Sequence, residues 1–348
     1  MTEASCHLVL VIPGLCGPSL DTPATGYFPT TLPALERLLS RARVVEQPAS
    51  DPESTLAAFF RLPHGDGDQL AVAPLTWLDD TGERTTGFIM RADPVHLRAD
   101  QACLRLFDST TFDLNAQEAR DLVATLNDYY SRQGWQLHAP LPQRWYLTLN
   151  ETPELVTVAP MRLAGRDISD GMPQGKHAVT WHAFLNEVQM LFHEHQVNLA
   201  REQRGEPAVN SIWPWGGGYL PGRISTTVNM MIAVNPLPRG LARLAGIPCR
   251  DLPVDATELM VESQGGLQLV WLDRLERPSR YGEVEAWYEG ISQLEQTWFR
   301  PLLDLLKQGR VDRLDIYPVS DRRYQITRRG LRCFWKPDRS LAWHCGHV

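Results

Sequence analysis

The sequence predicts an α/β fold, in which a mainly parallel sheet is flanked by helices and an α+β domain is inserted into the chain. The continuous apolar run His7–Ile12 is typical of a strand buried on both faces of a parallel sheet. Helices are then expected over Thr31–Ala42 and Glu53–Leu62, around a short strand over Arg43–Glu46. The middle of the chain breaks this alternation, which resumes after Pro207.

The two N-terminal helices have recognisable faces and ends. Ser50 or Asp51 is suited to cap the second helix, and Pro52 fits a first helical position. The apolar face of the first helix consists of leucines at helical spacing: Leu32, Leu35, Leu38 and Leu39.

The middle of the chain has the pattern of an α+β module. A helix over Asp113–Ser131 is capped by Asn115 or Asp113, and the longest helix is expected over Ala178–Arg204. The polar, Gly- and Pro-rich segment Asp167–Lys176 is expected to be a loop. Strands are expected over Gln69–Trp77, Gly87–Ala92, Gln143–Leu149 and Leu155–Val158.

The α/β alternation returns in the last part of the chain. A helix is expected over Arg239–Ala245, ending at Gly246, and a long one over Glu283–Lys307. We therefore expect a discontinuous core of residues 1–65 and 206–348, with residues 66–205 inserted as the second domain. Strand-like segments are Ser211–Trp213, Thr227–Val234, Leu267–Leu272, Arg313–Tyr317 and the ladder-like Arg323–Trp335.

Composition excludes several classes of protein. The 348 residues allow two domains or one large one, at roughly 100–200 residues per domain. Hydrophobic residues (43%) and charged residues (22%) are balanced as in a globular protein, which excludes collagen-like, coiled-coil and wholly disordered chains. No apolar run approaches the roughly 20 residues of a membrane helix, and no basic segment indicates a secretory signal, so a cytoplasmic protein is expected. The net charge of −7 argues against a dominant nucleic-acid surface but leaves a local basic patch open.

The six cysteines and the histidines give no clear chemical site. No CxxC pair is present, and in a reducing compartment free thiols are expected. The tail around His344, Cys345 and His347 resembles a metal cluster, but a frayed terminus is the simpler expectation. His193 and His195 lie too far apart around a helix to share a metal.

One stretch carries a family resemblance. It comprises Asn186–Gln189, His195–Gly205 and Pro207–Gly218, the last with Trp213, Trp215 and three successive glycines. It resembles the signature of archaeal-type cofactor-independent phosphoglycerate mutases of the alkaline phosphatase superfamily, and more closely their shorter bacterial relatives, the RpfE-type proteins. The segments Leu8–Gly14, Leu32–Leu39, Ser50–Leu62 and Gly240–Gly246 resemble other parts of these proteins more weakly.

Two interpretations of this stretch stay open from the residues alone. Two tryptophans at i, i+2 on a strand face one side, where they either form a core or a binding face. Gly216 and Gly217 either permit a tight packing contact or expose N–H groups to a phosphate. The polar side chains that favour ligand binding in the same segment are Asn198, Arg201 and Asn210.

The resemblance implies two divalent metals beside a Ser or Thr nucleophile, held by Asp and His ligands at strand ends. Ser50 matches the nucleophile position, whereas Gly14 stands where the first metal-binding Asp would be. Asp273 and Asp321 match ligand positions and are candidate remnants of the site. Where the family has histidines, Arg280 or Tyr281 and Arg322 occur here. The resemblance therefore implies that the metal site is lost, and we expect no cofactor.

Arginine cannot ligate a metal but suits an anion. Arg277, Arg280, Arg322 and Arg323 therefore form either an arginine-lined anion pocket or a solvated surface. Arg91 matches a family arginine that implies contact with a phosphorylated substrate; the alternative is an ordinary strand-end arginine.

We accordingly expect a degenerate, non-catalytic phosphoglycerate-mutase-like protein with a regulatory role, binding a phosphorylated or other anionic ligand or a protein partner. The alternatives are an active phosphoglycerate mutase or metal-dependent phosphatase with rearranged ligands, and a structural partner without a ligand. Neither a membrane nor a nucleic acid is an expected partner.

Overall fold

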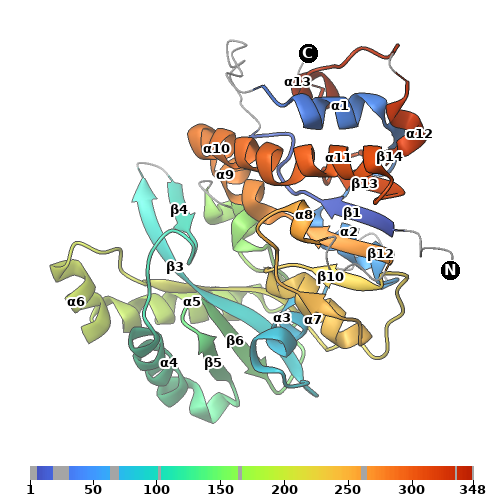
Figure 1. Cartoon of the computed structure of the whole chain (residues 1–348). Coiled ribbons are helices and arrows are strands. Elements are labelled where there is room, and N and C mark those ends of the chain that lie inside the picture. The colour runs from blue at the N-terminus through green and yellow to red at the C-terminus, as the bar shows by residue number, and fades with distance from the viewer. Residues whose placement is uncertain are drawn as a thin grey trace. The chain divides into compact units, whose positions relative to one another are not determined.

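The computed structural model describes residues 6–18, 31–62, 70–100, 103–163, 167–259, 265–333 and 335–346. The chain divides into two compact units (Figure 1). Unit 1 combines the N-terminal part of the chain with everything from Arg223 onward, and unit 2 is the intervening segment up to Gly222.

Unit 1 is built on a seven-stranded sheet of the order β11-β10-β12-β1-β13-β14-β2. From β11 to β13 all neighbours are parallel, whereas β14 is antiparallel to both β13 and β2. The strands are β1 (Cys6–Val11), β2 (Arg43–Glu46), β10 (Met230–Ile232), β11 (Cys249–Arg250), β12 (Gly266–Trp271), β13 (Arg313–Tyr317) and β14 (Arg322–Thr327). The predicted mainly parallel sheet with flanking helices is confirmed.

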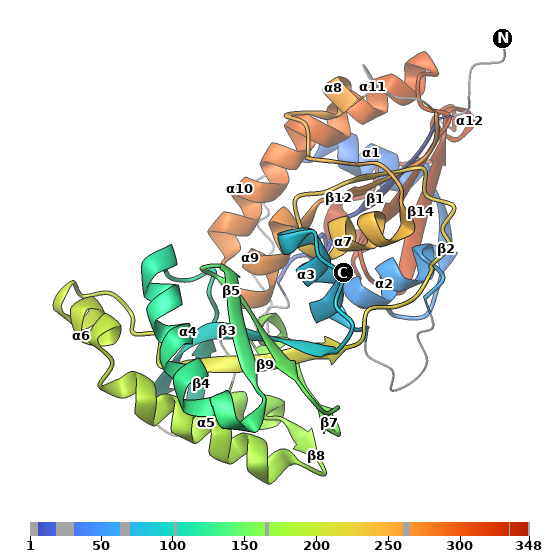
Figure 2. The same ribbon diagram turned by 90° about the horizontal axis from the view of Figure 1, so that it is seen from below.

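Helices cover both faces of this sheet. Figures 1 and 2 show α1 (Pro33–Arg41) and α11 (Arg300–Gln308) on one face, and α2 (Pro52–Phe59) and α7 (Pro236–Ala245) on the other. Strand β1 lies at the centre and is apolar on both sides, which is why its sequence shows no alternation. On the α1 face, Leu8 and Leu10 of β1 and the following Ile12 join one core with the leucines of α1 and α11.

A buried carboxylate on the long C-terminal helix fixes the start of α1. That helix, expected over Glu283–Lys307, forms as α10 (Val284–Leu294), a π-helical turn over Glu295–Phe299 and α11. In that turn Glu295, only 2% exposed, accepts hydrogen bonds from the N–H groups of Ala34 and Leu35 at 2.8 and 3.0 Å. It thereby satisfies donors that Leu32, the residue preceding α1, cannot cap.

Unit 2 contains a second, antiparallel sheet of the order β4-β3-β6-β5, in which β9 pairs with β3. Helices α4 (Ala116–Tyr130) and α5 (Ala178–His193) share one core with this sheet, and α3 (Val72–Thr81) packs on β3 and β9. The strands are β3 (Phe88–Asp100), β4 (Cys103–Phe107), β5 (Gln136–Leu141), β6 (Arg144–Leu149) and β9 (Ser211–Gly218); β7 (Leu155–Val156) pairs separately with β8 (Gln174–Gly175).

Three sequence expectations in unit 2 are wrong. The boundary expected at residue 206 lies after Gly222, because β9 pairs along β3 from Val95 to Ile89. A strand was expected over Gln69–Trp77, but from Val72 onward the chain forms helix α3, which carries Pro74 in its first turn and ends at Gly82 in the left-handed conformation. The single long helix over Ala178–Arg204 is two helices, because His195 caps α6 (Gln196–Gln203) by accepting from the N–H of Val197.

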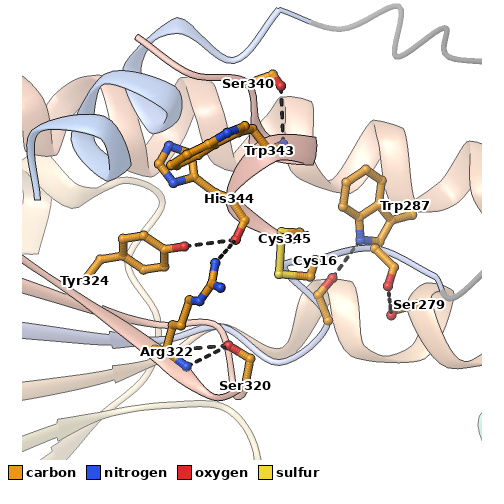
Figure 3. The surroundings of a disulfide bond; sticks show 12 residues. Cys16, Ser279, Trp287, Ser320, Arg322, Tyr324, Ser340, Trp343, His344 and Cys345 are labelled. Atoms are coloured by element: carbon orange, nitrogen blue, oxygen red, sulfur yellow. Dashed lines mark hydrogen bonds between the residues drawn. A yellow bond between two sulfur atoms is a disulfide. The ribbon is translucent and has the colours of Figure 1, made fainter. Parts of the chain in front are cut away.

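Up to Gly346 the C-terminal tail is folded rather than frayed, while His347 lies outside the described residues. Two cysteines expected as thiols form a disulfide (Figure 3). Helix α13 (Leu341–His344) is capped by Ser340. Cys345, which follows it, is bonded to Cys16 with a Cα–Cα distance of 5.3 Å. His344 is buried, and its carbonyl accepts a hydrogen bond from the Tyr324 hydroxyl at 3.2 Å. The other four cysteines form no disulfide: Cys6, Cys103, Cys249 and Cys333.

Candidate functional site

The candidate site lies where the parallel strands of unit 1 end, which we call the carboxyl edge. Strands β1, β10, β12 and β13 run in one direction, and β2 shares it because two antiparallel steps separate it from β13. In open α/β sheets, ligands bind outside the carboxyl ends of the strands. The residues that follow these strands are Gly14, Asn235, Asp273, Asp321 and Ser50.

Ser50 lies in the loop between β2 and the N-terminus of α2. Asp51 caps this helix, with 2.7 Å from its Oδ1 to the N–H of Ser54. Ser50 Oγ lies 3.1 Å from Thr55 Oγ1, which itself donates to the carbonyl of Asp51 at 2.9 Å. Because Thr55 has a single hydroxyl proton, Ser50 is the donor of the Ser50–Thr55 hydrogen bond. In the described part of the chain, no histidine or carboxylate side chain forms a hydrogen bond with Ser50 to activate it.

The loop after β13 supports the Ser50 loop and carries backbone strain. Gln47 donates from its backbone N–H to the carbonyl of Asp321 at 2.8 Å and from its side chain to the carbonyl of Ser320 at 3.1 Å. Val319 has φ 63°, a left-handed conformation that is an outlier for a β-branched residue. Such strain clusters at functional sites, which agrees with the position of the candidate site at this edge.

Three carboxyl groups come together at the carboxyl edge. Asp273 Oδ2 accepts from the Asn235 side chain at 3.0 Å, and burial raises the pKa of Asp273. Burial raises the pKa of Glu276 to about 7, while Arg280 opposes this and the charges of Glu53 and Asp273 add to it. At neutral pH this edge therefore holds a partly protonated acid.

These residues do not fit the two-metal centre that the resemblance implies. Gly14 has φ +79°, and a Cβ atom there would lie 2.4 Å from the carbonyl oxygen of Leu275. The backbone of the neighbouring segment thus fills the space in which an Asp side chain would begin. Where the resembled family has two histidines, this chain has Arg280 or Tyr281 and Arg322. Asp321, which matches a ligand position, is exposed. Within the described residues, no three His, Cys, Asp or Glu side chains are arranged to hold a metal.

The four arginines that were candidates for an anion pocket make separate intramolecular contacts. Arg280 Nε lies 3.4 Å from Glu276, and Arg277 Nη2 lies 2.9 Å from Glu283. Arg323 donates to the Tyr317 hydroxyl at 2.7 Å. Arg322 is adjacent to it on β14 and so points to the opposite face, where its guanidinium approaches the carbonyl of His344 at 3.5 Å (Figure 3).

The tryptophans of the Trp–Gly stretch lie in the core of unit 2. Trp213 is 1% exposed and donates from its indole to the carbonyl of Val158 at 2.7 Å. Trp215 is half-buried and donates to Asp93 Oδ2 at 2.7 Å. Both contact the same hydrophobic cluster, as expected for i, i+2 positions of one strand.

The glycines that follow let the chain approach itself closely. Gly216 has φ +61°, and a Cβ there would lie 3.0 Å from the side chain of Val72. A Cβ at Gly217 would lie 2.8 Å from Phe88. Of the two interpretations of these glycines, the structure shows the packing contact within unit 2.

The polar candidates of unit 2 are likewise engaged by their own chain. Asn198 donates to the carbonyls of Phe192 and Val209 and accepts from the N–H of Val209. Asn210 pairs with both backbone groups of Leu97. Arg201, 1% exposed, donates to two backbone carbonyls and to Glu118.

Arg91 lies inside unit 2 rather than at a strand end. It forms an ion pair of 2.6 Å with Asp93, and both side chains are buried. Its guanidinium lies 5.3 Å from the rings of both Tyr146 and Trp215. Burial raises the pKa of Asp93, and the charge of Arg91 opposes this. Arg91, Asp93 and Trp215 thus form one cluster. From the sequence, only Arg91 of the three was a candidate site residue with a ligand contact.

Comparison with known proteins gives distant relatives. No protein-family model matches the chain. The 2,3-bisphosphoglycerate-independent phosphoglycerate mutase of Methanosarcina barkeri is 25% identical over 140 residues, which are 39% of this chain and 35% of that protein. Its counterpart in Methanothrix thermoacetophila is 24% identical over 220 residues, 58% of this chain and 55% of that protein. Among solved structures, the PH0037 protein of Pyrococcus horikoshii has a TM-score of 0.52 at 13% identity, with 93% of this chain and 87% of that chain covered.

These findings establish distant homology to the phosphoglycerate mutases and a shared fold with the Pyrococcus protein. The alignments span only 35% and 55% of the length of the two curated relatives. Among the described residues, no helix is long and apolar enough to cross a membrane.

Proposed function

We propose that this chain is a phosphoglycerate-mutase-like protein of the RpfE type that has lost the two-metal centre and acts by binding. Its ligand is an anionic or phosphorylated molecule, or a protein partner, in a regulatory role. The observation that carries the proposal is the contact at Gly14, where the carbonyl of Leu275 occupies the space of a ligand side chain.

The chemistry of the carboxyl edge supports a loss of catalysis. A serine hydroxyl is a weak nucleophile unless a metal or a base activates it. Ser50 donates to Thr55, and the acid nearby, Glu276, is paired with Arg280. Phosphoryl transfer also requires cations that neutralise the transferring group. A fixed guanidinium can bind a phosphate but cannot supply the open coordination positions of a divalent metal.

Anion binding at the carboxyl edge would use the helix N-terminus, the serine and the arginine that lie there. The N-terminus of α2 follows Ser50, and the positive end of its helix dipole favours an anion. We propose that Ser50 and Arg280 are the residues through which an anion would act, with Asp273 and Asp321 as remnants of the ancestral ligands. Arg322 is a proposal of lower rank, because its guanidinium points to the other face of the sheet, toward the carbonyl of His344. The remaining candidates for ligand binding are proposals of lower rank, because their side chains or backbone already make contacts within unit 2. They are Arg91, Asn198, Arg201, Asn210, Gly216 and Gly217.

The test combines turnover with metal content. The purified chain is assayed for mutase activity on 3-phosphoglycerate and for general phosphatase activity with added Mn²⁺, beside an archaeal phosphoglycerate mutase as positive control. We expect no turnover, no stoichiometric metal and no effect of EDTA on the melting temperature. Turnover that Ser50→Ala abolishes and the neighbouring Ser54→Ala leaves intact would establish the active enzyme instead.

A further inference from the structure

A basic pocket lies in unit 1 between three helices, remote from the carboxyl edge. It has a volume of about 490 Å³ and is lined by Arg37, Arg41, Leu303, Lys307, Arg328, Leu331 and Arg332. The lining comes from the end of α1, the end of α11 and the short helix α12 (Arg328–Leu331). These segments adjoin the starts of β2 and β13 and the end of β14, so the pocket flanks the opposite, amino edge of the sheet.

The pocket carries an excess of positive charge in a chain whose net charge is −7. Arg37 and Arg41 share a single carboxylate, Asp338, at 3.2 and 3.1 Å. Lys307 pairs with Asp304 at 2.9 Å. Five cations are therefore balanced by two carboxylates. Within the described residues, no carboxylate lies within ion-pair distance of Arg328 or Arg332.

Helix dipoles explain only some of these cations. Arg41 and Lys307 lie in the last turns of α1 and α11, where a positive charge is stabilised by the helix C-terminus. Arg328 begins a helix of four residues and Arg332 follows its end, and both are exposed. Cations that share one pocket repel each other, and the repulsion is relieved when an anion binds between them. Arg41 adds a guanidinium whose side chain is only 8% exposed and held in place.

We propose that the basic pocket binds a small polyphosphate, that is, a ligand with several adjacent phosphoryl groups. Its volume lies in the range of about 300–1,000 Å³ that small-molecule sites occupy. Guanidinium groups bind phosphate bidentately, and four of the five cations are arginines. A single phosphate would engage only part of this set, whereas a chain of phosphates can neutralise it. Nucleoside polyphosphates and inorganic polyphosphate both contain such a chain of adjacent phosphoryl groups.

The experiment measures binding of inorganic tripolyphosphate to the full chain by calorimetry and by melting temperature, at constant ionic strength. The double variant Arg328→Ala/Arg332→Ala removes two exposed cations of the pocket, so we expect its fold to persist, as circular dichroism will verify. The matched control is Arg310→Ala/Arg329→Ala, which removes two exposed arginines of the same region that do not line the pocket. Should the pocket variant melt early, Arg328→Gln/Arg332→Gln replaces it. ATP is the second probe.

We expect tripolyphosphate to bind the native chain and the control equally, and the pocket variant at least tenfold more weakly. Inorganic phosphate should bind far more weakly than tripolyphosphate. Equal affinity for ATP and tripolyphosphate would assign recognition to the phosphate chain, and tighter ATP binding would assign a nucleotide. The proposal is overturned if millimolar tripolyphosphate neither binds nor raises the melting temperature, or if the two double variants lose affinity equally. Because the carboxyl edge is untouched, these outcomes are independent of the proposed function.

Discussion

Gly14 is the residue on which the proposed loss of the metal centre depends. Its positive φ and its contact with the carbonyl of Leu275 both exclude a side chain. Gly282 offers a matched comparison, since its φ is +68° but nothing lies within 4 Å of its Cβ position. We expect Gly282→Asp to cost about 1 kcal/mol for the backbone conformation alone, and Gly14→Asp about 3 kcal/mol or more because overpacking is added. Urea unfolding of both variants measures the difference, and equal costs would contradict the steric argument.

Glu276 predicts a pH dependence of stability. Burial raises its pKa in the folded chain to about 7, above the value near 4.5 of an unfolded chain. The folded state therefore binds more protons between these values, and stability falls as pH rises from about 4.5 through 7. Glu276→Gln should flatten this part of the profile and raise stability at pH 8 by about 1–3 kcal/mol. Exposed Glu285→Gln is the control, and a profile that Glu276→Gln leaves unchanged would refute the assignment.

Trp213 tests the core role of the Trp–Gly stretch. Its indole is buried and hydrogen-bonded to Val158. Trp213→Ala should lower the free energy of unfolding by ~3–5 kcal/mol through cavity formation. Half-buried Trp215→Ala should cost less from packing, although it also leaves Asp93 without one donor. A nearly neutral Trp213→Ala would instead favour a binding face.

Single residues of the candidate site were only partly predictable from the sequence. Ser50, Asp273 and Gly14 were located because they match positions of the family that the sequence resembles. Glu53 had no expected role beyond starting the helix Glu53–Leu62, although its charge acts on Glu276 in the structure. Sequence spacing gave no sign of this proximity, because the two residues belong to different helices that only the sheet order brings to one edge.

At the scale of elements, the covalent link between the loop after β1 and the tail after α13 was not predictable. Cys16 and Cys345 are separated by 329 positions, and no spacing rule connects them. The same limit applies to α3, whose apolar run suits a strand or a helix until Pro74 and Gly82 are taken as helix ends. By contrast, β1 was predictable because a strand buried on both faces leaves an unbroken apolar run.

The disulfide should stabilise unit 1 by holding its tail. A disulfide typically contributes about 2–4 kcal/mol, and this one closes a very long loop. We expect a reductant to lower the melting temperature of the native chain and to speed hydrogen exchange in α13. The Cys16→Ser/Cys345→Ser variant should have the melting temperature of the reduced native chain, and the reductant should not change it. Thiol titration of the denatured, unreduced chain should find four thiols; six would show that the bond does not form in the purified protein.

At the scale of the whole molecule, the sequence identified an insertion but misplaced where it ends. The change back to an α/β pattern after Pro207 suggested that the core resumes there. Strand β9 nevertheless belongs to unit 2, because its partner is β3 and its tryptophans complete that unit's core. A short apolar strand does not reveal which sheet it joins, since the pairing depends on residues more than a hundred positions away.

This assignment predicts which fragment of the chain folds alone. Residues 67–222 contain the hydrophobic cluster around α4 and α5 together with both partners of the β3–β9 pairing. We expect that fragment to unfold cooperatively, with dispersed amide resonances and a buried tryptophan fluorescence. A fragment of residues 67–205, ending at the boundary expected from the sequence, lacks β9 and exposes the inner edge of β3, so it should aggregate or fail to fold. Supplying residues 207–222 as a separate peptide should partly restore structure to it. If both fragments fold equally well, β9 is dispensable to unit 2 and the division of the molecule must be placed nearer residue 206.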